Sequence, residues 1–448
     1  MNRSANRSQS SSLALLLSTG TKLLIIVLNA ATGILSARGL RAEGRGELAA
    51  MILWNVLLAN AFTLGIPSAL TYQLRNFPGK RSELVGASLL LSGVTSALAM
   101  LLGFAGMTHW IPQYSPQVIF FSRLFLLNIP FFAWSLIGRA SVESVGDFRI
   151  SNLSLTLAPL LTLLGLCALW WTHTFTPVTA AWIYVGMGLP SFGLVMWRVV
   201  EVFRPSLAGL GEASRLLLSY GIRSYGIDLC GTMAFYVDQA LVIHLLIPSM
   251  MGAYIVALSL SRMLNAFHTA VVMVLFPRIA SQPVSLILDL TGQAVRITTL
   301  LTATSALFIA VLGPRLLTLL YGSEYARASG VVRILVVEVV LSGVAQVLSQ
   351  AFMALGRPGV VTTFQVVGLA LTIPLMLVFI PRFGVEGAAS SLLISTAFRL
   401  LFVTVSFRRL LNVNCPRILA GVADISRMAA TLKSLLRPRT GSIAEGVV

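Results

Sequence analysis

The sequence contains few charged residues for its length. Asp, Glu, Lys and Arg make up 10% of the 448 residues, whereas 56% are hydrophobic and the mean hydropathy is +0.88. A water-soluble domain carries about 25% charged residues, because its surface must be wetted. This composition excludes a soluble domain and predicts a chain that crosses a membrane several times.

Acidic residues and cysteines are scarce. The chain has 15 Asp and Glu against 32 Lys and Arg, a formal net charge of +17. Nucleic-acid-binding chains carry such an excess on hydrophilic surfaces, but here the basic residues lie between apolar runs, which excludes a nucleic-acid partner. The three cysteines, Cys167, Cys230 and Cys415, are far apart, so neither a disulfide framework nor a metal-ligand pattern is present.

Catalytic motifs are also missing. The four histidines are isolated, and the sequence has no zinc-protease, P-loop, dinucleotide-binding or serine-hydrolase pattern. We therefore expect no enzymatic activity, no cofactor and no metal. The missing nucleotide motif excludes an intrinsic ATP-driven pump.

Long apolar runs dominate what is present. A transmembrane helix needs about 20 apolar residues, and continuous rather than alternating runs indicate helices. The first run is too long for a signal peptide and is interpreted as the first span. The predicted fold is an all-α integral membrane protein with about 12 helices, at roughly 14–36, 48–71, 84–107, 118–138, 152–172, 179–199, 217–246, 250–276, 295–320, 331–355, 360–380 and 386–406.

The basic residues predict the orientation of these spans. With a cytoplasmic N-terminus, twenty Lys and Arg fall on the inner side, a clear positive-inside bias. We therefore expect a bacterial cytoplasmic membrane protein with both termini inside. Seven arginines fall outside, namely Arg38, Arg41, Arg45, Arg315, Arg327, Arg333 and Arg382.

The chain divides into two sets of six spans. We predict an N-terminal lobe at 1–200, a cytoplasmic linker at 201–215 and a C-terminal lobe at 216–406. Two weak internal repeats support this division: 42–48 matches 248–254 at an offset of 206, and 145–148 matches 355–358 at an offset of 210. Parallel repeats of this kind are common in secondary transporters.

The C-terminal tail at 407–448 is basic and amphipathic. Apolar residues recur at helical spacing from Ile418 to Leu436, flanked by Arg and Lys. This stripe is predicted either to lie on the anionic cytoplasmic leaflet or to dock against the helical bundle.

Ionisable residues inside the spans are the candidate functional residues. Each costs about 2.5–3.5 kcal/mol on insertion scales, so each should face the bundle interior or an aqueous cavity. Guanidinium groups suit phosphate in particular. The five basic residues predicted to line a cavity for an anionic headgroup are Lys22, Arg262, Arg223, Arg123 and Arg399. Pairing with acids and snorkelling to the interface are the alternatives.

Three acids and two amides complete the candidate set. Asp228, Asp238 and Glu338 could carry H+ or Na+ during transport, or they could simply neutralise Arg223 or Arg262. Gln346 and Gln350 lie on one helix face and could line the cavity or join two helices.

Several motifs resemble those of a known family. The segments 36–50, with Ala37-Arg38-Gly39-Leu40 and Glu43-Gly44-Arg45-Gly46-Glu47, and 64–72, with Leu64-Gly65-Ile66-Pro67, are similar to those of the polysaccharide (O-antigen, Wzx-like) flippases of the multidrug/oligosaccharidyl-lipid/polysaccharide (MOP) exporter superfamily. Arg41-Ala42 replaces the family's usual Gly-Pro. Asp238-Gln239 and the 320–325 segment also resemble family motifs, so the similarity reaches both halves.

This resemblance implies a function. It implies two six-helix lobes around a cationic central cavity with alternating access, and an undecaprenyl-diphosphate-linked oligosaccharide as the passenger, with membrane lipid, a polysaccharide polymerase and assembly proteins as partners. The alternatives are a drug antiporter of the multidrug and toxin extrusion (MATE) type, a peptidoglycan-precursor flippase and a membrane-embedded polysaccharide enzyme. Buried bases count against the first, twelve spans against the second and short outer loops against the third.

Overall fold

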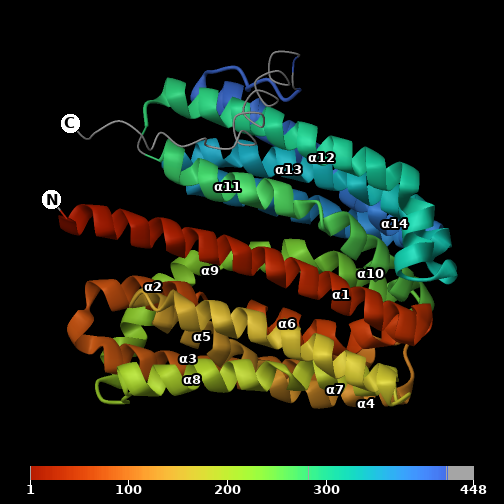
Figure 1. Ribbon diagram of the computed structural model, residues 1–448, viewed down its shortest axis with the longest axis horizontal. Coiled ribbons are helices and arrows are strands. Elements are labelled where there is room, and N and C mark those ends of the chain that lie inside the picture. Colours follow the sequence, from red (N-terminus) through yellow and green to blue (C-terminus); the bar gives the residue numbers. More distant parts are fainter. Residues whose placement is uncertain (1, 281, 420, 422–448) are drawn as a thin grey trace, which may run out of the picture.

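The computed structural model describes residues 2–280, 282–419 and 421, and these residues form helices joined by short turns (Figure 1). The N-terminal half contains α1 (Asn2–Ala61), α2 (Ile66–Asn76), η1 (Pro78–Lys80), α3 (Arg81–Trp110), α4 (Pro116–Phe125), η2 (Leu126–Asn128), α5 (Ile129–Ser144), α6 (Phe148–Trp171), α7 (Pro177–Gly186) and α8 (Gly188–Phe203). The C-terminal half contains α9 (Leu210–Leu245), α10 (Pro248–Arg262), α11 (Asn265–Ile279), α12 (Val284–Leu320), η3 (Ser323–Ala328), α13 (Ser329–Ala354) and α14 (Pro358–Leu411).

The apolar runs form membrane-spanning helices, because a helix satisfies its own backbone hydrogen bonds where water is absent. In the described chain eight helical segments are long and apolar enough to cross a membrane, or ten if each of two bent pairs counts as one span. The bent pairs are the two parts of α9, and α10 with α11. The fold is therefore that of an all-α, multi-pass membrane protein, as predicted.

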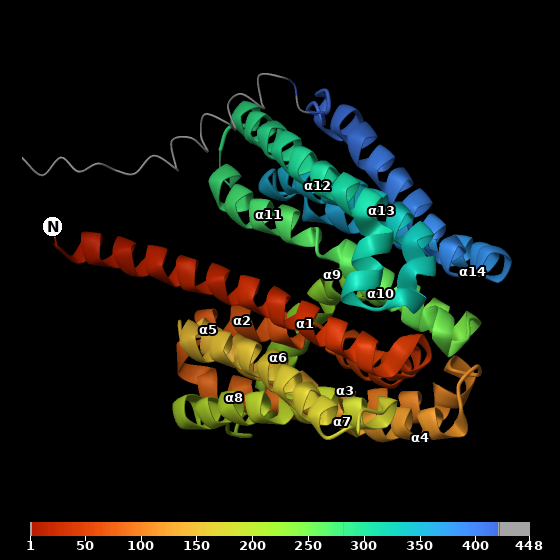
Figure 2. The ribbon, with the colours of Figure 1, turned by 45° about the vertical axis from the view of Figure 1, so that its right-hand side comes forward.

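Two of these segments are kinked and each contains two crossings. α14 has a non-helical residue at Gly384 (φ 58°). Thr372 Oγ1 donates to Ser395 Oγ at 2.7 Å, although 23 residues of straight helix would extend about 35 Å, so α14 folds back on itself. α1 is kinked at Arg41 (φ 57°), and its ribbon turns sharply within the helix (Figure 2). Counting each kinked helix as two crossings gives the twelve predicted spans.

The helices pack in two groups. In both views α2 to α8 form one bundle and α11 to α14 the other, with α1, α9 and α10 between them (Figures 1 and 2). α9 contacts α2 and α3 as well as α14, so it connects the two groups. The domain boundaries at 200 and 216 stay a prediction, and α9, which the prediction assigned to the second lobe, packs on both.

Two glycines bring the two halves into backbone contact. A Cβ atom on Gly46 would lie 1.8 Å from the carbonyl oxygen of Pro248, and one on Gly252 would lie 1.8 Å from that of Ala42. Gly252 follows Gly46 by 206 residues, and Pro248 follows Ala42 by the same 206 residues, which is the offset of the internal repeat in the sequence. A two-fold relation between the halves accounts for this reciprocal contact, and only glycine fits it.

Two side-chain contacts at the same end repeat this symmetry. Arg38 Nε donates to the carbonyl of Leu320, at the C-terminus of α12, at 2.9 Å. His244 Nδ1, in the last turn of α9, lies 3.3 Å from the carbonyl oxygen of Trp110, at the C-terminus of α3. The two side chains are 206 residues apart and the two carbonyls 210 apart. Each half thus caps a helix of the other.

The linker and the tail differ from the expectation in extent. α8 ends at Phe203 and α9 begins at Leu210, so the loop covers 204–209, inside the predicted linker. α14 continues to Leu411, past the predicted end of the last span at 406, and its last turn contains Arg408 and Arg409, whose positive charge is favourable at a helix C-terminus. Residues 412–419 are not helical, and the predicted stripe from Val422 onward lies outside the described residues.

The glycine contact generates a prediction about stability. Gly46→Ala or Gly252→Ala should lower the unfolding free energy by about 1–3 kcal/mol, since backbone carbonyls cannot yield as a flexible side chain does. The measurement is thermal unfolding of the purified protein in detergent. Gly193→Ala in α8 is the control, because a Cβ there meets nothing within 4 Å. Equal unfolding temperatures for all three variants would contradict the contact.

Candidate functional site

A cavity of about 530 Å³ lies between the two groups of helices, lined by residues of α1, α9, α10, the first residue of α11 and Tyr321. Its lining is polar for the interior of a membrane protein. The polar side chains come from Asn29, Arg45, Gln239, Ser259, Arg262 and Asn265. We refer to it as the inter-lobe cavity.

Arg262 is the best-defined cation of the inter-lobe cavity. It is the last residue of α10, where the helix dipole favours a positive charge. Its Nη2 lies 3.2 Å from Asp238 Oδ2 and donates to the carbonyl of Phe235 at 3.3 Å. The guanidinium also stacks over the Phe235 ring, 4.4 Å from its centroid. These contacts hold the guanidinium in place. The hydrogen bonds to Asp238 and Phe235 both use Nη2, so its other N–H groups remain available to a ligand.

Asp238 is fully buried and serves several partners. Its Oδ2 accepts from Tyr254 at 2.9 Å as well as from Arg262. Its Oδ1 has no hydrogen-bond partner. Asp238 therefore neutralises Arg262, the structural alternative that the sequence left open, and the pair carries no net charge.

Arg45 is a cavity residue that sequence reasoning missed. It was assigned to an outer loop, but the helix resumes directly after the kink at Arg41, so Arg45 lies in a helical turn. It lines the inter-lobe cavity with Arg262, and its Nε is buried without a partner. The Gly44-Arg45-Gly46 triplet was the available signal, because glycines on both sides allow close packing.

Lys22 lies in α1 about two helical turns N-terminal to Asn29. It is exposed, and its Nζ is 3.3 Å from the Sδ atom of Met273 in α11. A thioether is a weak acceptor, so the ammonium keeps most of its capacity for an anion. Lys22 thus faces the opposite group of helices across the molecule.

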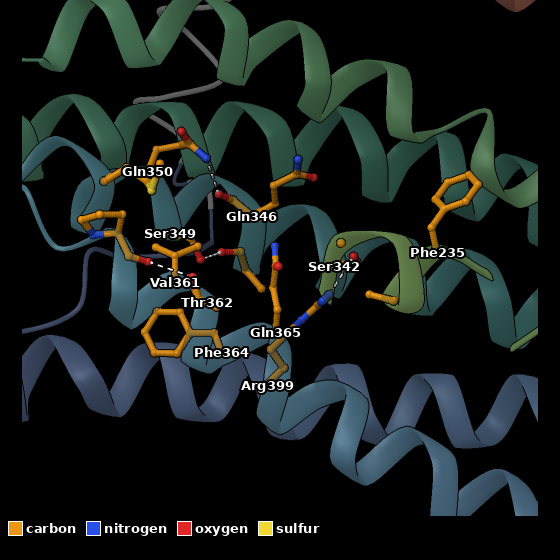
Figure 3. Close-up of a pocket in the computed structure, with 15 residues that line it drawn as sticks. Phe235, Ser342, Gln346, Ser349, Gln350, Val361, Thr362, Phe364, Gln365 and Arg399 are labelled. Carbon is orange, nitrogen blue, oxygen red and sulfur yellow. Dashed lines mark hydrogen bonds between the residues drawn. The ribbon is translucent and has the colours of Figure 1, made fainter. Parts of the chain in front are cut away.

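A second polar region lies within the C-terminal group of helices (Figure 3). A cavity of about 450 Å³ is lined by residues of α9, α13 and α14, among them Gln346, Gln350, Gln365 and Arg399. A smaller one of about 140 Å³ shares Arg399 with it and contains Glu338 and Arg262. The smaller cavity therefore connects the larger one to the surroundings of Arg262.

Arg399 and Glu338 are held by hydroxyl groups in this region. Arg399 Nη2 donates to Ser342 Oγ at 3.0 Å, and its Nε is buried without a partner. Glu338 Oε1 accepts from Thr396 Oγ1 at 2.7 Å. In the described part of the chain neither residue forms an ion pair within 4 Å, so their direct partners are hydroxyl groups.

The remaining candidates lie apart from these cavities. Asp228 accepts from Ser68 in α2 at 3.2 Å, and not from Arg223, which is exposed on α9. Arg123 lines an apolar pocket between α3 and α4, where it donates to Thr108 at 2.7 Å. The structure brings Arg262, Arg399, Glu338 and both glutamines together, and leaves Arg123, Arg223 and Asp228 outside that group.

The chain can be compared with known protein families and with individual proteins. No family model matches the chain. Over 188 residues it is 26% identical to the "Probable low-salt glycan biosynthesis flippase Agl15" of Haloferax volcanii, a match that spans 41% of this chain and 40% of that protein.

Solved structures decide the fold. The lipid II flippase MurJ in an inward closed conformation matches with a TM-score of 0.76 at 12% identity, over 96% of this chain and 94% of that one. An inward-facing multidrug resistance MATE family transporter of the MOP superfamily matches with a TM-score of 0.69 at 16% identity, over 92% and 96%. The chain has the MOP superfamily fold. The predicted resemblance to MOP flippases is confirmed.

The Arg262–Asp238 pair generates a prediction. Asp238→Ala should lower the unfolding free energy by about 3–5 kcal/mol, because it leaves a partly buried guanidinium without its counter-charge. Adding Arg262→Ala should restore part of that loss, since no uncompensated charge remains. Unfolding of the single and double variants in detergent measures the coupling, and strictly additive losses would contradict the pair.

Proposed function

We propose that the protein is a flippase that moves an undecaprenyl-diphosphate-linked oligosaccharide from the cytoplasmic to the outer leaflet of a bacterial cytoplasmic membrane. The observation that supports the proposal is the inter-lobe cavity, in which Arg45 and Arg262, the latter paired with Asp238, face one space between the two groups of helices. Agl15, the curated relative, is described as a probable flippase of glycan biosynthesis.

The chemistry of the cavity fits a diphosphate headgroup. Arginine binds phosphate oxygens through two parallel hydrogen bonds, and Arg45 retains an unpartnered buried donor. Lys22 adds a charge nearer the cytoplasmic end, where the headgroup would first arrive. The lipid tail would remain in the bilayer, so only the polar portion needs a path through the protein.

The same features weigh against a drug antiporter. The MATE transporter shares the fold, and a fold is compatible with many substrates. Arg262 is neutralised by Asp238, but Arg45 adds a positive charge to the cavity lining, and this charge disfavours the organic cations that such an antiporter would carry. The fold of MurJ likewise leaves the peptidoglycan precursor open as a substrate, and the cationic lining would suit its diphosphate too.

Alternating access would require the lobe contacts to open. With both termini in the cytoplasm, the Arg41 kink and the reciprocal glycine contact lie at the outer end. Arg38 joins α1 to α12 there, and Tyr325 Oη donates to the carbonyl of Ala37 at 3.2 Å. In this orientation the outer end is closed, and these contacts would break when the cavity opens outward.

Counter-transport of H+ or Na+ is proposed to use Glu338. Asp238 is already matched to Arg262, and Asp228 lies outside the connected cavities. Glu338 faces a polar cavity with a hydroxyl partner and no ion pair, so it can bind a cation without first breaking one. A polymerase and other assembly proteins are proposed to receive the translocated lipid.

Removing the guanidinium groups that line the cavity should impair export. The double variant Asp238→Asn/Arg262→Gln keeps the shape and neutrality of the pair, and should reduce surface polysaccharide by about tenfold or more, with lipid-linked repeat units accumulating inside. Arg45→Gln should act in the same direction.

The control is Arg382→Gln, an exposed arginine at the loop between the two segments of α14. It should leave export unchanged. Normal surface polysaccharide in the double variant, with normal protein in the membrane, would reject the cationic cavity as the headgroup site.

The outer closure makes a separate prediction. Arg38→Ala removes a charged donor from the end of α12, so the outward-open fraction should rise by about tenfold. A cysteine at Ser259, in a variant with the three native cysteines replaced, reports this through labelling by an impermeant maleimide from the outer face. Arg315→Ala is the control, and unchanged labelling in Arg38→Ala would contradict this contact's role in closure.

A further inference from the structure

The cavity within the C-terminal lobe has a lining unlike that of the inter-lobe cavity. Apolar residues such as Phe235, Met353 and Phe364 line it together with Arg399. Its other polar side chains are amides and hydroxyls, from Gln346, Gln350, Gln365, Ser342, Ser349 and Thr362 (Figure 3). We refer to it as the amide pocket. Such groups both donate and accept hydrogen bonds and carry no charge.

The amides of this pocket do not hold helices together. Gln350 Nε2 donates to the backbone carbonyl of Gln346 within α13, at 3.3 Å. Gln365 Oε1 is buried without any partner. A buried polar atom without a partner costs about 1–3 kcal/mol, so polar residues that served only as interhelical contacts would be paired. The unused capacity indicates a ligand.

The hydroxyls behave in the same way. Ser349 Oγ donates to Ala345 and Thr362 Oγ1 to Pro358, each within its own helix. Their oxygens therefore keep lone pairs that face the pocket. Amide and hydroxyl groups arranged around one space are complementary to a molecule that presents many hydroxyls.

The charge of the lining residues excludes some classes of ligand for the amide pocket. The amide pocket contains Arg399 and no carboxylate among its lining residues, so a metal cation or an organic cation would be repelled. An apolar ligand would leave the glutamines unpaired. A volume of about 450 Å³ lies in the range of small-molecule pockets. A neutral or acidic sugar satisfies all three conditions.

The position of Phe235 connects this pocket to the proposed headgroup site. Phe235 lines both the amide pocket and the inter-lobe cavity, its side chain is 48% exposed, and its ring stacks under Arg262. A sugar attached to a diphosphate at Arg262 would therefore meet the Phe235 ring first. Beyond the ring lie Gln346 and Gln365.

We propose that the amide pocket binds the sugars next to the diphosphate and thereby selects which lipid-linked oligosaccharide is carried. This inference rests on the proposed function and adds a site to it. In this proposal the arginines of the inter-lobe cavity bind the diphosphate. Gln346 and Gln365 in the C-terminal group of helices form hydrogen bonds with the carbohydrate.

The test separates the two parts of the ligand. The purified full-length protein in nanodiscs is titrated with undecaprenyl diphosphate, and with the same lipid carrying one glucose, galactose, N-acetylglucosamine or glucuronic acid. Wild type should bind at least one sugar-bearing lipid about tenfold more tightly than the bare lipid, the effect of two or so hydrogen bonds.

The variant Gln346→Met/Gln365→Met keeps side-chain volume and removes the amides. It should lose that difference and bind the bare lipid as wild type does. Its unfolding temperature should equal or exceed that of wild type, because an unpaired polar atom is removed. Gln293→Met in α12, which does not line the pocket, is the matched control and should retain the sugar preference.

Three results would overturn the inference. Equal wild-type affinity for every lipid, an equal loss for bare and sugar-bearing lipids in the glutamine variant, or a lower unfolding temperature of that variant would each reject a sugar site. The proposed function survives these results if Asp238→Asn/Arg262→Gln loses affinity for the bare lipid. If wild type binds neither kind of lipid, both proposals fail.

Discussion

The reciprocal contact of Gly46 and Gly252 is the constraint on which the architecture depends. Each glycine lies against a backbone carbonyl of the other lobe, closer than any side chain would allow. The lobes therefore approach to backbone distance at one end. The helices that carry Asn29, Arg45 and Arg262 line the cavity between them. At this contact glycine Cα atoms pack against backbone carbonyl groups. The two surfaces can therefore separate without breaking a strong hydrogen bond or an ion pair.

Charge inside the membrane is handled in two ways. Arg262 is held by Asp238, a backbone carbonyl and an aromatic face, so its position is defined and its charge is matched. Arg399 and Glu338 instead contact hydroxyl groups in polar cavities. The first arrangement fixes the position of the Arg262 guanidinium. The second leaves Arg399 and Glu338 with hydroxyl partners in place of a direct ion pair.

Much of the fold could be predicted from sequence. The twelve spans follow from hydropathy, because each apolar run in lipid must satisfy its backbone hydrogen bonds internally and therefore forms a helix. The offsets of 206 and 210 anticipated contacts that the structure contains. The Gly44-Arg45-Gly46 triplet indicated close packing, but it could not show that Arg45 lines the cavity, because the helix continues after the kink at Arg41 through what looks like a loop in the sequence. The location of Arg123, in an apolar pocket away from the other bases, depends on which helix face turns inward.

The sequence by itself determined the class of protein, the number of crossings, the charge asymmetry and the residues able to carry chemistry. These properties are local, since each is set by the composition of a single segment. The tertiary structure alone decided that Asp238 faces Arg262, that Arg45 shares their cavity, and that Gln365 joins Gln346 around a separate pocket. Such groupings depend on the rotation of each helix about its axis. Helix packing sets that rotation, and hydropathy does not encode it.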